Sequence, residues 1–169
     1  MAHPMYGQNK SDDALDKIAS SPLVEEAVTQ SLTLSDSGKT FVVGAGSAAA
    51  FTLPAADRKH LGCRYLFVWS AAETDAITIA SADATDTTGD LFVGGLLSCN
   101  AAAVNTVAQA VTGSNLSLMT LDDNVANTGG GPGTWVEVIC IDVARWFVRG
   151  IVEGDSDADG VGSAIFSNA

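Results

Sequence analysis

The fold is decided by residues 135–152, which read WVEVICIDVARWFVRGIV. Both halves of this stretch are rich in Val, Ile, Phe and Trp, and a short polar break at residues 142–145 separates them. Such side chains fit the pleated surface of a β-strand better than a helix. The stretch therefore predicts a hairpin of two strands, residues 135–143 and 146–152.

Similar short runs, separated by turn residues, extend from this hairpin back to residue 31. Asp36-Ser37-Gly38-Lys39 predicts a turn, and Pro54 ends a strand. The further strands are expected at residues 31–34, 40–43, 50–53, 64–69, 76–80, 91–93 and 116–121. Short strands at this spacing, with few helix signals, predict a mainly β fold: an antiparallel β-sandwich or barrel, similar to a jelly roll.

The Ala-rich segment 101–111 leaves two interpretations open. Val104, Val107 and Val111 recur at helical spacing, which slightly favours a helix that crosses the sheet over a further strand.

Three regions are expected along the chain: an N-terminal arm over residues 1–30, a β module over 31–154 and a C-terminal tail over 155–169. In the arm, Ser11 can cap a short helix over residues 12–19, and Ser21-Pro22 is a second start signal for a helical turn over 23–28. Such arms have little core of their own and commonly dock on a neighbouring molecule.

Composition excludes several classes of partner. The chain has 8 Lys and Arg against 20 Asp and Glu, a net charge of −12, so nucleic acid and anionic membranes would repel it. Its start lacks the apolar core of a signal peptide, and no apolar stretch reaches the roughly 18 residues of a membrane span. The widely spaced Cys63, Cys99 and Cys140 predict free thiols rather than a zinc site. We expect synthesis in a reducing cytoplasm.

Three motifs resemble ligand sites and depart from them. Gly38-Lys39-Thr40 lacks the first glycine of a phosphate-binding loop, and a strand follows where a helix is required. Gly44-Ala45-Gly46-Ser47-Ala48-Ala49 matches a dinucleotide fingerprint, but Phe51-Thr52-Leu53-Pro54 predicts a strand instead of the required helix. Asp155, Asp157, Asp159 and Gly160 match the start of a calcium loop, but Phe166 replaces its bidentate glutamate, so a solvated acidic tail is favoured. No metal or cofactor is predicted.

The sequence offers little to a catalytic mechanism. His3 lies in the arm and His60 in a charged loop, and Ser47 is not in a nucleophile elbow. Asp122-Asp123 is most simply a pair of solvated loop acids, and Trp69, Trp135 and Trp146 are more typical of a core or an interface. We therefore expect no catalytic residues and a protein that is not an enzyme.

Residues 31–69 and 134–152, about a third of the chain, resemble a recurring β module of bacteriophage virion proteins. The residues that carry the resemblance are Leu32-Thr33-Leu34-Ser35-Asp36-Ser37-Gly38-Lys39-Thr40-Phe41, Phe51-Thr52-Leu53-Pro54, Gly62-Cys63-Arg64-Tyr65-Leu66-Phe67, Trp135-Val136-Glu137-Val138 and Trp146-Phe147-Val148-Arg149-Gly150. They form turns and strands, and no active-site residues come with them.

Together with the arm, the resemblance implies a capsid decoration (cement) protein of a tailed bacteriophage. Such a protein would lie on the outer capsid surface of the virion, bind the major capsid protein and form a homotrimer, without nucleic acid or membrane as a partner. The alternative is a tail or head-fibre module that attaches to glycans on the host surface. For the first function we expect that deletion of residues 1–30 leaves a folded module that no longer binds capsids.

Overall fold

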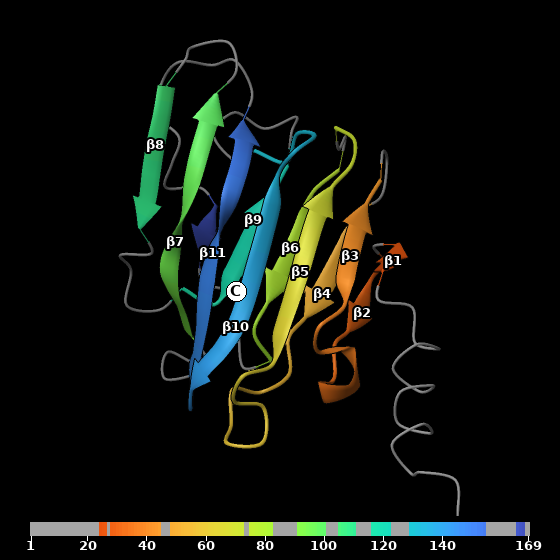
Figure 1. The fold of residues 1–169 in the computed structure, drawn as a ribbon, viewed down its shortest axis with the longest axis vertical. Coiled ribbons are helices and arrows are strands. Elements are labelled where there is room, and N and C mark those ends of the chain that lie inside the picture. Colours follow the sequence, from red (N-terminus) through yellow and green to blue (C-terminus); the bar gives the residue numbers. More distant parts are fainter. Residues whose placement is uncertain are drawn as a thin grey trace, which may run out of the picture.

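Two mixed β-sheets pack face to face in the computed structural model, and Figure 1 looks onto the larger one with the smaller sheet behind it. The structure describes residues 24–26, 28–44, 48–72, 75–82, 91–100, 105–110, 116–122, 129–154 and 165–167. The larger sheet, sheet A, contains in spatial order β1 (Val24–Glu26), β3 (Thr40–Val43), β5 (Arg64–Trp69), β10 (Trp135–Asp142), β11 (Arg145–Gly154), β7 (Leu91–Asn100) and β8 (Asn105–Ala110). Sheet B contains β12 (Phe166–Ser167), β9 (Leu118–Leu121), β6 (Ile77–Ala80), β4 (Ala49–Thr52) and β2 (Gln30–Ser31), and the 3-10 turn η1 (Leu34–Asp36) lies between β2 and β3.

The first six strands wind back and forth between the two sheets. β1, β3 and β5 belong to sheet A, whereas β2, β4 and β6 belong to sheet B. Because the chain crosses to the other sheet and returns, every second strand runs in the same direction. Neighbours within each sheet therefore pair in parallel, as Phe41 with Phe67 and Phe51 with Ile79 illustrate. The strand in the opposite sheet supplies the crossover that parallel pairing requires.

The hairpin of β10 and β11 sits at the centre of sheet A. β10 pairs antiparallel with both β5 and β11, and β11 pairs in parallel with β7. The register shifts between Cys140 and Asp142, so Ile141 is an extra residue at the end of β10, and Ala144 closes the turn with a φ of 62°. The bulge leaves the Ile141 side chain exposed.

The core is filled by side chains that alternate inwards along the strands. Phe41, Phe51 and Phe67 meet between the sheets, with ring centroids 4.8 to 5.4 Å apart, and Tyr65 packs against Trp146 at 5.9 Å. Buried aromatic rings at these separations contribute about 1 kcal/mol beyond the area that they bury. Because Phe51 comes from sheet B and its partners from sheet A, the cluster joins the two layers.

The sequence prediction of a mainly β sandwich is confirmed, with two differences in detail. The sheets are mixed where antiparallel strands were expected, because the first six strands alternate between the two sheets. The described strands do not close into a barrel. Among the residues that the structure describes, no helix has the length and apolarity to cross a membrane.

The helical turn expected over residues 23–28 was wrong, and of the two interpretations left open for the Ala-rich segment the described part adopts the strand, not the slightly favoured helix. Residues 105–110 of the Ala-rich segment form strand β8, because the neighbouring β7 offers an open edge that pairs with it from Gly95 to Asn100. Residues 24–26 form strand β1 on the edge of β3 instead of a helical turn. The predicted helix over residues 12–19 lies outside the described residues.

Both terminal regions contribute strands to the sandwich. β1 and Gln30 of β2 fall within residues 1–30, so a deletion that tests the arm alone has to end before residue 24. In the tail, Ile165 is buried and β12 pairs with β9. The predicted strand over residues 31–34 is divided between the end of β2 and the start of η1.

Gly94 is the backbone position most sensitive to a side chain. Its φ is 111°, and a Cβ atom there would clash with the carbonyl oxygen of Val148 and the ring of Phe147 on the neighbouring strand. We expect Gly94→Ala to lower the free energy of unfolding by about 3 kcal/mol, from backbone strain and overpacking together. Chemical denaturation measures the change. Gly44→Ala is the matched control, because open space surrounds Gly44, and equal midpoints for the two variants would contradict this account.

Candidate interaction surface

The residues that resembled a phosphate loop form a turn at the start of β3. Gly38 has a φ of 89°, and its backbone N–H donates to the carbonyl oxygen of Arg64 at 2.8 Å. The Lys39 Nζ lies 2.8 Å from Asp36 Oδ1, so this cation neutralises a carboxylate of its own chain. Thr40 then begins a strand. The site has the structural role that the turn signal predicted.

The second and third motifs cannot be placed. Residues 45–47 of the dinucleotide-like stretch, Asp155, Asp157 and Asp159 of the calcium-like stretch, and His3 lie outside the described residues. Within the described ranges, no three His, Cys, Asp or Glu side chains gather as a metal site would require.

His60 lies in the loop between β4 and β5. Its side chain is buried, and its Nδ1 lies 2.8 Å from Asp57 Oδ1. In the part of the chain that the structure describes, no hydrogen bond joins this imidazole to a hydroxyl or a thiol. The Asp57 carboxylate lies beside this imidazole without the alignment of a hydrogen bond.

The cysteines and tryptophans divide between core and surface. Cys63, Cys140, Trp69 and Trp146 are buried, whereas Cys99 and Trp135 are partly exposed, and the cysteines are free thiols. Trp135 is therefore the tryptophan available to a partner among the three.

Large apolar side chains with exposed surface occur on several segments at one end of the sandwich, which we call the loop end. It comprises η1, the loop of residues 54–63 and the turn between β10 and β11, at the lower edge of Figure 1. Its large apolar side chains keep about half of their surface in solvent: Leu34 54%, Leu61 49%, Ile141 49% and Val143 51%. Apolar groups that gather at one place on a surface mark interaction sites more often than isolated ones do.

Backbone hydrogen bonds hold the segments of the loop end together. The N–H of Gly62 donates to Cys140 O at 2.8 Å, and the N–H of Cys140 donates to Cys63 O at 2.9 Å. The N–H of Ala144 donates to Ala56 O at 2.7 Å. The bulge at Ile141 and the turn at Val143 thus present their side chains from a backbone that is fixed against the neighbouring loop.

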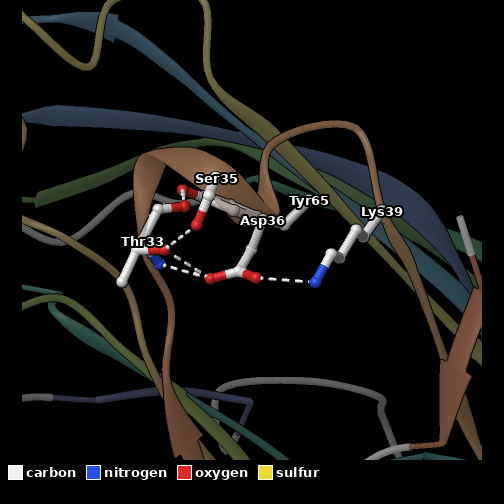
Figure 2. A network of polar contacts seen from close by, with 5 residues as sticks. All are labelled: Thr33, Ser35, Asp36, Lys39 and Tyr65. Atoms are coloured by element: carbon white, nitrogen blue, oxygen red, sulfur yellow. Dashed lines mark hydrogen bonds and ion pairs between the residues drawn. The ribbon is translucent and has the colours of Figure 1, made fainter. Parts of the chain in front are cut away.

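A polar network fixes η1 in the same way (Figure 2). Asp36 Oδ2 accepts hydrogen bonds from the backbone N–H of Thr33 at 2.8 Å and from its hydroxyl at 2.7 Å. The Tyr65 hydroxyl donates to the carbonyl oxygen of Thr33 at 2.9 Å, which ties the turn to strand β5. Burial raises the pKa of Tyr65, so the phenol stays protonated and remains a donor.

Charge also marks the loop end. Arg58, Arg64 and Arg145 are exposed, and none of them forms an ion pair with another described residue. Lys59 is exposed as well, with its Nζ 3.3 Å from Asp57 Oδ2. Cations and aliphatic side chains thus share one surface, a combination suited to a protein partner rather than to a small polar substrate.

Sequence reasoning did not find this surface. The loop of residues 54–63 and the turn between β10 and β11 lie about 80 residues apart in the chain, and the pairing of β5 with β10 brings them together. A local signal existed in Ile141 and Val143, two aliphatic residues that flank the polar Asp142 at the expected turn. Comparison with known protein families, with curated proteins and with solved structures finds no match to this chain.

The network around Asp36 predicts a pH-dependent stability. Burial of Asp36 would raise its pKa, but hydrogen bonds from Lys39 and Thr33 outweigh this and hold the pKa below its ordinary value of 3.8. A carboxyl group with a lowered folded-state pKa stabilises the fold above its unfolded-state pKa, and the contribution disappears as the pH falls through the folded-state pKa. We expect Asp36→Asn to cost about 1 kcal/mol at pH 7.

Urea unfolding of Asp36→Asn and of the unchanged chain at a series of pH values measures this difference. The gap should close below pH 3.8. Asp75→Asn is the control, because Asp75 is exposed and forms no ion pair within the described ranges. A gap that stays constant down to acid pH would show that the Asp36 carboxylate does not contribute through its charge.

Proposed function

We propose that this chain is a structural virion protein that decorates and stabilises a phage capsid. It would bind the outer surface of the major capsid protein lattice and act as a homotrimer. Support comes from the resemblance of residues 31–69 and 134–152 to virion β modules, and from a sandwich in which those residues form β3, β4, β5, β10 and β11. The role is mechanical, and no residue is assigned to catalysis.

The loop end is the observation that carries the proposal. Four aliphatic side chains stand half-exposed on a backbone that hydrogen bonds hold in place. Such a surface loses little conformational entropy on binding, because its backbone is already ordered. Burial of what each side chain leaves exposed would contribute about 1 kcal/mol.

A modest contact suffices for a protein that works in many copies. An interface built around these four side chains would be weak by the standards of a stable complex, which buries about 800 Å² on each partner. On a lattice, a trimer engages several sites at once, and each further contact forms at a high effective concentration. Many such contacts across capsomer seams resist the internal pressure of packaged DNA.

Cryo-electron microscopy of the particle that carries this chain tests the function. Density over the outer head surface at three-fold or quasi-three-fold positions is the expected result. Density confined to the tail or to one vertex would instead support the attachment module. Absence of the chain from the particle would overturn both virion functions.

The loop end makes a separate prediction about binding. We expect Val143→Asp and Leu61→Asp each to weaken binding to heads that lack the protein by roughly tenfold or more, because each removes an apolar contact and places a charge in the interface. Cosedimentation of the purified chain with such heads gives the affinity. Ala50→Asp, at an exposed position on sheet B, is the control. Equal binding by all three variants would exclude the loop end as the capsid contact.

A further inference from the structure

The outward side chains of sheet A are unusually apolar for the outer face of a sandwich. One row crosses five neighbouring strands through consecutive pairings and is apolar throughout: Val42, Val68, Trp135, Ile151 and Leu97. A second row, four residues along β10 from Trp135, joins Ile139 to Phe147 and Phe147 to Val93, and ends on β5 at Arg64. All of these side chains are partly or fully exposed. We call this surface the outer face of sheet A.

Sheet B provides an internal comparison. Its outward positions also alternate with buried ones, but apart from Leu118 they carry small or polar residues: Ala50, Thr52, Thr78, Ala80 and Thr120. A solvated outer face normally has this composition. The two outer faces of one sandwich therefore differ, and only the face of sheet A has the composition of a buried layer.

The charged groups between the two apolar rows neutralise each other. Glu137 Oε2 accepts hydrogen bonds from Arg149, with Nε at 2.7 Å, and from the same guanidinium through a second nitrogen at 2.6 Å. The Glu137 side chain is 13% exposed and that of Arg149 57%. Across these five strands a partner meets the paired Arg149 and Glu137, while Glu26 of β1 pairs with Val42 at the edge of the first row and Glu153 follows Ile151 by two residues on β11.

We infer that the outer face of sheet A is the surface through which copies of this chain associate with one another. The inference rests on the proposed function for the expectation that copies of the chain associate. It adds the surface through which they associate. Two chains of net charge −12 repel each other wherever their carboxylates meet. Self-association therefore requires a face whose acids are few and compensated, which the Glu137–Arg149 pair provides.

The size of the face agrees with a second copy as the occupant. The five strands are 4 to 10 residues long. At about 3.4 Å per residue and a spacing of about 4.8 Å, they cover on the order of 600 Å². Stable complexes bury about 800 Å² on each partner, with aromatic residues near the centre of the contact. Trp135, in the middle strand of the five, occupies such a position.

The test is the mass of the purified full-length chain by sedimentation velocity over a series of concentrations. The unchanged protein should sediment as a multiple of its 17.2 kDa chain mass. Val68→Lys should sediment as the single chain, because a lysine within the apolar row, next to Trp135, would be buried without a partner. Thr78→Lys, the same change in the middle of sheet B, should leave the assembly intact.

A milder variant guards against misfolding. The double change Val68→Thr and Ile151→Thr keeps β-branched side chains on both strands, and we expect it to raise the dissociation constant by roughly 100-fold while circular dichroism stays unchanged. An unchanged chain that remains at 17.2 kDa at every concentration, or a folded double variant that assembles as well as the unchanged chain, would overturn the inference.

The measurement needs no capsid, so it separates this inference from the proposed function. A chain that assembles through this face but does not bind heads would contradict the decoration function and leave the inference standing. A monomeric chain that binds heads would overturn the inference and the homotrimer, and would leave capsid binding standing.

Discussion

The contact of Phe41, Phe51 and Phe67 between the sheets is the interaction on which the rest of the structure depends. The three rings come from β3, β4 and β5, three strands that follow one another along the chain and lie in alternate sheets. Each crossing of the chain therefore adds a ring to the same cluster. The parallel pairings follow from this winding, and so does the position of β5, which offers its other edge to the hairpin of β10 and β11. That hairpin in turn carries the bulge of the loop end and the middle of the outer face of sheet A.

The strands of the module were largely predictable from sequence, because alternation of apolar side chains is a local property. The expected ranges 40–43 and 64–69 coincide with β3 and β5, and the expected hairpin matches β10 and β11 to within two residues at each end. What alternation cannot reveal is which sheet a strand joins, so the mixed pairing was missed. The sequence left helix and strand both open for the segment that forms β8, because small alanines carry a weak periodic signal. The open edge of β7 decides their conformation. Residues 24–26 likewise take their strand conformation from the edge of β3.

The candidate surfaces were less predictable than the fold, although part of their signal was present in the sequence. A half-solvated strand should alternate apolar and polar residues, yet β10 and β11 carry Trp135, Ile139, Phe147 and Ile151 at the positions that alternate with the buried ones. Strands that are apolar on both faces are expected to be covered on both sides. The excess of apolar residues in these two strands is therefore a sequence signal for a further covering layer. The loop end gives no comparable signal, because its four aliphatic residues come from three separate segments and form a group only in the folded chain.

The two surfaces also have a geometric relation that bears on decoration. The outer face of sheet A runs along the strands, whereas the loop end lies across their ends, so occupation of one surface leaves the other free. Copies that associate through the face about an axis parallel to the strands would present their loop ends side by side in one direction. Such an assembly would meet a lattice with several identical contacts at once, and the dissociation of one would leave the others in place. A surface that is too small to bind tightly as a single copy can therefore hold an assembly, and this division of labour explains why a small sandwich without a recognisable site would keep two apolar surfaces in solvent.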